Sequence, residues 1–303
     1  MKKYLAVVMA GLALLFGIQL GMERLFTDRL QETAETMADV PGDQASLEEP
    51  PEIYALFGVD TREGDAGRSD CVLLLSFAED SGTIRMCSIA RDTMVTIPGE
   101  ETKTKLGHAY ALGGPELALE TLNENFGLHV TRYATVNFSQ MEKLVDLMGG
   151  VELPLSQAEW RYLGLEEPYL GEKRLDGEEA LCYCRIRSID SDDARTARQR
   201  KLIAAMLEQV REVPRSQLPE LLGQGVRLCK TNIGLGELLH LGKAVASARQ
   251  ELDTVSMALP GEVVSAWGGI REDGVWYYVY DLTRASEVMG DFFAGTGGQE
   301  EKT

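Results

Sequence analysis

The run from Cys71 to Phe77 constrains the fold more than any other feature of this sequence. It reads Cys-Val-Leu-Leu-Leu-Ser-Phe, so apolar side chains follow one another instead of alternating with polar ones. Because successive side chains of a strand point to opposite faces, a strand with this composition has to be covered on both sides. The run therefore predicts a buried strand in a sheet that carries helices on both faces.

Strand-like and helix-like segments alternate around this run, which is typical of an α/β protein. We expect the other strands at Ile53–Val59, Ile84–Ile89, Tyr133–Asn137, Cys182–Arg187, Leu252–Leu259 and Val275–Tyr280. We expect helices near Glu116–Phe126, Gln140–Leu147, Asp193–Val213 and Thr283–Phe293, with helical stretches between Pro214 and Gln250. No linker interrupts residues 53–293, which predicts a single α/β domain with a mixed sheet, followed by a polar tail at residues 294–303.

The N-terminus carries a separate signal. Lys2 and Lys3 precede eighteen residues, Leu5 to Met22, whose only polar side chain is Gln19. A helix of this length covers most of a hydrocarbon core of about 30 Å, and the lysines keep its start in the cytoplasm. We expect residues 1–22 to be a single-pass membrane anchor, with a cleaved signal peptide as the alternative. Residues 23–52 are expected to form an extracellular helix and acidic stalk, ahead of an extracellular domain.

Charge and cysteine content argue against nucleic-acid binding and against a zinc site or disulfide framework. The chain has 30 Lys+Arg against 48 Asp+Glu, a formal net charge of −18, whereas sequence-independent nucleic-acid binding needs a basic face. We therefore expect no nucleic-acid partner. Five cysteines without paired Cys-x-x-Cys motifs favour core residues over a zinc site or a disulfide framework.

Several arginines gather in three segments of this acidic chain. In the strand expected at Cys182–Arg187, alternation places Tyr183, Arg185 and Arg187 on one face. In the run that follows, an aspartate caps a helix whose first turns carry Arg195, Arg198 and Gln199, at the end of a helix that favours anions.

The third group of charged residues lies at the ends of predicted strands, where α/β sheets commonly bind ligands. Asp60, Arg68, Asp70 and Arg91 all fall at such positions. Two guanidinium groups about 6 Å apart repel by roughly 3 kcal/mol at an effective dielectric constant near 20, so converging arginines need an anion or carboxylates between them. Arginine binds phosphate oxygens in a bidentate manner, which favours a pyrophosphate, and Asp60 with Asp70 suits Mg²⁺. The alternative is that each arginine forms an ordinary ion pair with a neighbouring aspartate.

Eight motifs occur in order along the predicted domain and together resemble the LytR-CpsA-Psr family of cell-envelope proteins. They are GVDTR (58–62), GRSD (67–70), SIARDT (88–93), KLGHAY (105–110), VNF (136–138), DLMGGVEL (146–153), LDGEEALCYCRIRS (175–188) and DARTARQRKLI (193–203). The resemblance covers roughly Ile53 to Phe293, and a preceding membrane anchor is the usual layout of this family.

The resemblance implies a membrane-anchored phosphotransferase on the outer face of the cell membrane. Such enzymes move a glycopolymer, of the teichoic acid or capsular polysaccharide type, from a polyprenyl-pyrophosphate carrier to a peptidoglycan hydroxyl, with Mg²⁺. The resemblance also implies that the polyprenyl tail of the carrier would occupy a groove within the apolar core. The alternatives are a non-catalytic envelope sensor or regulator of the transcriptional-attenuator type, and a polyprenyl-pyrophosphate hydrolase.

The resemblance also assigns roles to residues of this chain. Asp60 and Asp70 would hold the metal, and Lys105 would lie at the rim. The residues expected around the pyrophosphate are Arg68, Arg91, Arg185, Arg187, Arg195, Arg198 and Gln199. Arg91 is expected to act in catalysis, while the proton acceptor is left open between Asp60 and Asp192. His108 is expected to order a loop in preference to acting as the base.

Overall fold

The computed structural model describes residues 51–61, 67–79, 81–166, 168–247, 252–261, 264–296 and 301–302. The anchor predicted at residues 1–22 and most of the stalk predicted at residues 23–52 lie outside these ranges. Among the residues described, no helix is both long and apolar enough to cross a membrane.

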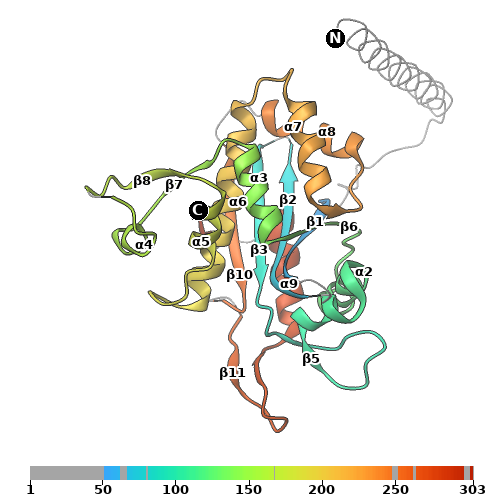
Figure 1. The fold of residues 1–303 in the computed structure, drawn as a ribbon. Helices are drawn as coiled ribbons and strands as arrows, with labels where there is room; N and C mark the ends of the chain where they lie inside the picture. Colours follow the sequence, from blue (N-terminus) through green and yellow to red (C-terminus); the bar gives the residue numbers. More distant parts are fainter. Residues whose placement is uncertain are drawn as a thin grey trace, which may run out of the picture. The chain divides into compact units, whose positions relative to one another are not determined.

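A mixed seven-stranded sheet forms the centre of the domain (Figure 1). Its strands, in spatial order, are β13 (Glu301–Lys302), β10 (Asp253–Leu259), β3 (Thr83–Ile89), β2 (Arg68–Ala78), β1 (Ile53–Asp60), β6 (Arg132–Asn137) and β9 (Lys230–Thr231). β1 is parallel to β6 and β3 is parallel to β10, whereas the other neighbours are antiparallel. The predicted mixed α/β fold is confirmed, and part of the predicted polar tail pairs with β10 as β13.

Helices cover both faces of this sheet. Leu74 of β2 belongs to a core shared with α2 (Leu106–Phe126) and α9 (Leu282–Ala294). Its neighbour Leu73 belongs to a core on the other face, shared with α6 (Asp192–Glu212) and α8 (Leu235–Ser247). Both side chains are at most 2% exposed. The cover predicted for both faces of the apolar strand β2 is thus confirmed.

The remaining elements surround this framework. The helices α3 (Phe138–Leu147) and α7 (Leu218–Leu228) lie on the same side as α6 and α8 (Figure 1). A side extension consists of β7 (Val151–Pro154), α4 (Gln157–Tyr162), β8 (Glu172–Leu175) and α5 (Gly177–Cys184). It packs around a third apolar core, to which α3 and α6 also contribute. Two small ladders are formed by β4 (Met94–Val95) with β5 (Thr104–Lys105), and by β11 (Trp267–Ile270) with β12 (Trp276–Val279). Figure 1 shows β5 and β11 at the same end of the central sheet.

The strand expected at Cys182–Arg187 is wrong, because Cys182–Cys184 is the end of helix α5 and the remaining three residues form no strand. Asp176 and Glu179 form a capping box that starts the helix, a signal present in the run Leu-Asp-Gly-Glu-Glu. Ala180, Tyr183 and Cys184 then follow helical spacing and are buried. Tyr183 is therefore in the core while Arg185 is exposed, so they do not share a face as predicted.

Helix α2 is longer than expected because it begins at Leu106 and continues past a kink. Gly113 and Gly114 have non-helical backbone angles, with φ of +71° at Gly114, and Pro115 restarts the helix. His108, expected to order a loop, therefore lies in the first turn of a helix.

Candidate functional site

A β-bulge shapes the strand ends that carry the first candidate residues. Gly58 pairs with Cys71 and Val59 pairs with Ser69, so Asp70 is an extra residue in β2. A Cβ atom at Gly58 would lie 2.9 Å from the Cβ of Cys71, which explains why this position is a glycine. Bulges of this kind redirect side chains, and this one brings Asp70 to the edge of two cavities.

The first, which we call the charged cavity, has a volume of about 110 Å³. Its lining consists of Arg68, Ser69, Asp70, Arg91, Asp92, Lys105, Gly107 and His108. Arg91 Nη1 lies 2.5 Å from Asp70 Oδ1, and Lys105 Nζ lies 2.6 Å from Asp92 Oδ1. Asp92 Oδ2 also lies 3.4 Å from Arg91 Nε, so this carboxylate bridges two cations. The structure thus brings Arg68, Arg91 and Lys105 together, as predicted.

The backbone of α2 closes one side of the charged cavity. Gly107 donates a hydrogen bond from its N–H to the carbonyl oxygen of Arg91, at 2.9 Å. A Cβ atom at this position would lie 2.8 Å from the carbonyl oxygen of Ser69. Glycine therefore permits the close approach of α2 to β2 that holds Lys105 and His108 beside Arg91.

The surroundings of His108 in the charged cavity disfavour its protonated form. Burial lowers the pKa of His108, and the nearby charges of Arg68 and Lys105 lower it further, against the opposing effect of Asp92. Its Nδ1 lies 3.0 Å from the hydroxyl of Thr104, which fixes the ring. Burial lowers the pKa of Arg91, but Asp70 and Asp92 outweigh this effect and the net shift is upward, so this guanidinium stays charged.

The second, which we call the apolar cavity, has a volume of about 230 Å³ and lies between the sheet and helices α3, α5 and α6. Apolar side chains of these elements line it, while Asp70, Asn137, Arg185 and Gln199 are its polar members. The guanidinium carbon of Arg185 lies 4.6 Å from the centroid of the Phe138 ring, which holds this exposed arginine at the cavity. Asp70 lines both cavities, so a cationic compartment adjoins an apolar one.

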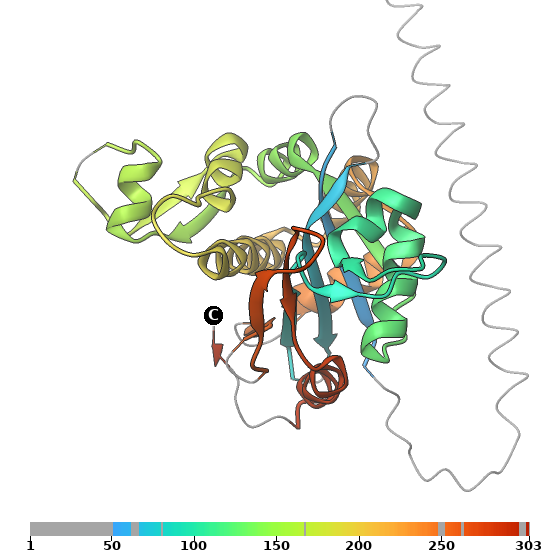
Figure 2. The same ribbon diagram turned by 90° about the horizontal axis from the view of Figure 1, so that it is seen from below.

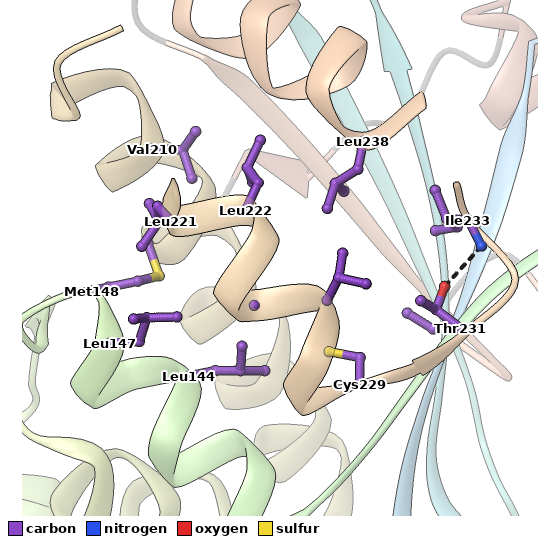
Figure 3. Close-up of a pocket in the computed structure, with 13 residues that line it drawn as sticks. Leu144, Leu147, Met148, Val210, Leu221, Leu222, Cys229, Thr231, Ile233 and Leu238 are labelled. Atoms are coloured by element: carbon purple, nitrogen blue, oxygen red, sulfur yellow. Dashed lines mark hydrogen bonds between the residues drawn. The ribbon is translucent and has the colours of Figure 1, made fainter. Parts of the chain in front are cut away.

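A further apolar pocket of about 150 Å³ adjoins the apolar cavity (Figure 3). Ala134, Leu144 and Cys229 line both. Figure 3 shows Leu221, Leu222 and Leu238 of α7 and α8 pointing into this pocket. Apolar lining therefore continues from Asp70 to the α7–α8 helix pair.

Arg195 and Arg198, in the first turns of α6, have different surroundings. Arg195 is 3% exposed and lies close enough to Cys71 for its charge to lower the pKa of that thiol. Burial has the larger effect and raises the pKa of Cys71 to about 11. Gln199 lines the apolar cavity and Arg195 lies beside Cys71, which lines the same cavity; their predicted contact with a pyrophosphate stays a prediction.

Arg198 departs from its predicted place around a pyrophosphate. Its Nε donates to Glu159 Oε1 at 2.7 Å, its Nη1 donates to the carbonyl oxygen of Ile186 at 3.2 Å, and its Nη2 pairs with Asp190. Its side chain is 4% exposed. Arg198 is therefore an ion-pairing residue of the fold, as in the alternative considered for the arginines, and it connects α6 to α4.

Three other predicted residues, Asp60, Arg187 and Asp192, line neither cavity. Asp60 is half-buried at the end of β1, directly opposite Arg68. Arg187 is exposed beyond the end of α5. Asp192 is the first residue of α6, and the helix is capped by Ser191, so the prediction of an aspartate cap is wrong.

Asp60 and Asp70 offer the oxygen donors that a divalent cation takes. They lie near the ends of adjacent strands, with Asp60 opposite Arg68 and Asp70 the bulged residue two positions further along β2. Oxygen donors are what Mg²⁺ requires, and it commonly takes one or two carboxylates plus phosphate oxygens. No cluster of three or more His, Cys, Asp or Glu side chains that could hold a metal occurs within the described ranges, so phosphate or water would supply the other ligands.

Sequence reasoning missed two contributors to the site. The first is Phe138, the last residue of the VNF motif, whose ring contacts Arg185. The sequence does not indicate this contact, because it forms only when two segments that are distant in the chain meet. Arg200 is buried and donates to the Ser88 hydroxyl at 3.1 Å, beside Cys71. The Arg-Gln-Arg run at 198–200 was a signal for it, because three long polar side chains in succession cannot all face solvent on a helix packed against a sheet.

Known proteins resemble this chain over most of its length. The model of the LytR_cpsA_psr family matches residues 24–292. The polyisoprenyl-teichoic acid–peptidoglycan teichoic acid transferase TagU of Enterococcus faecalis is 32% identical over 306 residues, covering 95% of this chain and 96% of that protein. Its namesake from Oceanobacillus iheyensis is 32% identical over 259 residues, covering 82% of this chain and 76% of that protein.

A solved structure, described as TagT bound to LI-WTA, has the same fold. It superposes with a TM-score of 0.65 at 26% identity, covering 83% of this chain and 92% of that one. The family match extends over most of the chain, and the two curated relatives exceed 30% identity over at least 82% of it. The chain therefore belongs to the LytR-CpsA-Psr family.

Proposed function

We propose that this protein is a phosphotransferase that moves an anionic cell-wall glycopolymer from a polyprenyl-pyrophosphate carrier to a peptidoglycan hydroxyl. The curated relatives are named as teichoic acid transferases, which supports a teichoic acid type of donor over a capsular polysaccharide. One observation carries the proposal: Asp70 lines both the charged cavity and the apolar cavity. A lipid pyrophosphate has this same division, because a doubly phosphorylated head is joined to a hydrocarbon tail.

The tail of the carrier is assigned to the apolar cavity and to the pocket beside α7 and α8. Their combined lining is almost entirely apolar, and each methylene removed from water contributes about 0.8 kcal/mol. The pyrophosphate is assigned to the junction of the two cavities, within reach of Arg68, Arg91, Lys105, Arg185 and Arg195. Arg187 and Gln199 are proposed at its periphery.

Arg91 is the residue proposed to stabilise the transferred phosphoryl group. In phosphoryl transfer, charge spreads over the non-bridging oxygens, and the protein contributes positioning and cationic stabilisation. Arg91 is held in place by Asp70 and Asp92, so it needs no reorganisation at the moment of reaction. The acceptor hydroxyl forms a new P–O bond in line with the bond that breaks, and polyprenyl phosphate leaves with the electron pair.

Asp60 and Asp70 are the residues proposed to hold Mg²⁺. When bound, this ion would neutralise phosphate charge beside Asp70, a carboxylate that would otherwise repel the pyrophosphate. The acceptor proton is assigned to a carboxylate, Asp60 or Asp192, and we leave the choice between them to experiment.

The proposed placement is a single-pass protein of the cell membrane with a cytoplasmic N-terminus. It rests on Lys2, Lys3 and the apolar run Leu5–Met22. The domain from residue 53 onward would then face the peptidoglycan. Protease digestion of intact cells without their wall is expected to cleave this domain, and full protection would contradict the placement.

Transfer by the detergent-solubilised full chain tests the function. A radiolabelled polyprenyl-pyrophosphate-linked teichoic acid and peptidoglycan are expected to give labelled peptidoglycan, and Arg91→Ala and Arg185→Ala are expected to lower the rate at least a hundredfold. Arg284→Ala is the matched control, because Arg284 is an exposed arginine of α9 paired with Glu287. Release of polyprenyl phosphate without labelled peptidoglycan would favour a hydrolase. Donor binding without any turnover would favour a sensor.

A further inference from the structure

The hairpin formed by β11 and β12, which we call the aromatic hairpin, exposes large apolar side chains next to the charged cavity. Trp267 is 53% exposed, whereas Trp160 in the side extension is 3% exposed. Figure 1 shows the hairpin projecting beyond the end of the sheet. Exposed aromatic groups that are gathered on a projecting element mark interaction sites in soluble domains.

The strand register determines which side chains share a face of this hairpin. Trp267 pairs with Val279 and Gly269 pairs with Tyr277, so these four lie on one face. Ile270 pairs with Trp276 on the other face. A Cβ atom at Gly269 would lie 2.6 Å from the Trp267 ring, so the indole lies close against a position with no side chain. The absence of a side chain at Gly269 thus lets the indole lie along the strand, where half of it remains open to solvent.

The face that carries Trp267 is the one turned toward the charged cavity. On that face Lys105 Nζ lies 5.8 Å from the centroid of the Tyr277 ring. The backbone N–H of Tyr278 donates to the carbonyl oxygen of Asp92 at 2.9 Å, and the hydroxyls of Tyr280 and Thr93 lie 3.1 Å apart. Figure 2 shows the hairpin beside the β4–β5 ladder. The hairpin is therefore fixed to the segment that holds Arg91 and Asp92.

We propose that Trp267 is a stacking platform for a sugar ring of the acceptor, the glycan strand of peptidoglycan. This proposal rests on the proposed transferase function and names the surface that receives the second substrate. The electron-rich face of an indole attracts the polarised C–H bonds of a pyranose ring, and a fixed aromatic ring loses little entropy on binding. The lipid donor reaches Asp70 through the apolar cavity, so the acceptor has to approach from the solvent side, where the aromatic hairpin lies.

The charges of the hairpin favour the acceptor over other occupants. Its tip carries Arg271, Glu272 and Asp273, all exposed, with two carboxylates against one guanidinium. These carboxylates repel the phosphate-rich polymer of the donor, whereas they repel an N-acetylated glycan strand less. They also oppose insertion of the tip into a bilayer, because charged side chains at membrane depth are costly.

Transfer kinetics of the full chain in detergent test this assignment. Trp267→Ala is expected to raise the KM for an uncrosslinked peptidoglycan glycan strand about tenfold, with a change in the donor KM of less than twofold. Trp267→Phe keeps an aromatic face and should restore most of the acceptor affinity. Ile270→Ala is the matched control, since Ile270 is an exposed apolar residue on the opposite face. An unchanged acceptor KM in Trp267→Ala would overturn the proposal while leaving the transferase function intact.

A binding measurement on the wild-type chain gives a second readout. A soluble chito-oligosaccharide is expected to protect tryptophan emission from acrylamide quenching, because Trp267 is the most exposed of the three tryptophans. Protection by vesicles of phosphatidylglycerol and phosphatidylethanolamine but not by the sugar would assign the hairpin to a membrane surface and overturn the proposal. A self-association in sedimentation equilibrium that Trp267→Ala abolishes would likewise assign it to a second copy. Absence of donor turnover in the wild type would instead refute the proposed function.

Discussion

Replacement of Arg198 by methionine separates the arginines that hold the fold from those proposed to hold substrate. Methionine keeps the length and apolar character of the arginine stem but removes its charge and its hydrogen bonds. Glu159, whose side chain is 12% exposed, then loses its cationic partner. We expect Arg198→Met to destabilise the protein strongly while the folded fraction retains donor binding.

The expected magnitude follows from the burial of each contact. Removal of one partner from a buried ion pair costs about 3–5 kcal/mol, because the remaining charge stays desolvated. The pair with Asp190 adds no more than about 1 kcal/mol, since that carboxylate is 33% exposed and is screened by solvent. We therefore expect a loss of about 4 kcal/mol in the free energy of unfolding. For a domain of this size, that corresponds to a decrease in Tm of about 10 °C.

Thermal and urea unfolding of the variants measure this effect. A second change, Glu159→Gln, should recover a large part of the loss in the Arg198→Met background. The amide removes the buried charge but still accepts from the Ser156 N–H through its oxygen, so the cap of α4 persists. If Arg198→Met lowers the free energy of unfolding by less than about 1 kcal/mol, Arg198 does not hold the fold as described. A loss of donor binding without a change in Tm would also contradict its structural role.

Three further changes test the site. Ala134→Phe places a ring where the apolar cavity meets the pocket beside α7 and α8. Binding of a long-chain polyprenyl pyrophosphate should weaken at least about tenfold, because two methylenes displaced from the pocket lose about 1.6 kcal/mol of burial. Equal affinity of the variant and the wild type for this donor would contradict the assignment of the tail. Asp60→Asn should raise the Mg²⁺ concentration for half-maximal transfer about tenfold, and an unchanged Mg²⁺ titration would remove Asp60 from the metal site. The pKa of His108 is lowered in the folded protein, so below about pH 6.5 the unfolded chain binds more protons than the folded one, and the free energy of unfolding falls as the pH decreases. His108→Gln should make this fall less steep in denaturation curves measured between about pH 5 and pH 7.5. An unchanged dependence of stability on pH would contradict the lowered pKa.

The sequence was sufficient wherever local periodicity decides structure. The apolar run Cys71–Phe77 required cover on both faces, and β2 has it. The short segment Cys182–Arg187 shows the limit, because alternation and helical spacing are indistinguishable over so few residues. The capping box at Asp176 and Glu179 would have decided in favour of the helix.

Arg195 and Arg198 show what the sequence alone could not decide. Both lie in the first turns of α6, three residues apart, and the helix pattern predicts equally well that either faces an anion. The tertiary structure directs Arg195 toward Cys71 and pairs Arg198 with Glu159, which is 39 residues away in the chain. Periodicity along a chain specifies which side chains become buried, because burial depends on the face of a helix or strand. The partner that a buried charge meets depends on how distant elements pack, and packing is set by the whole fold.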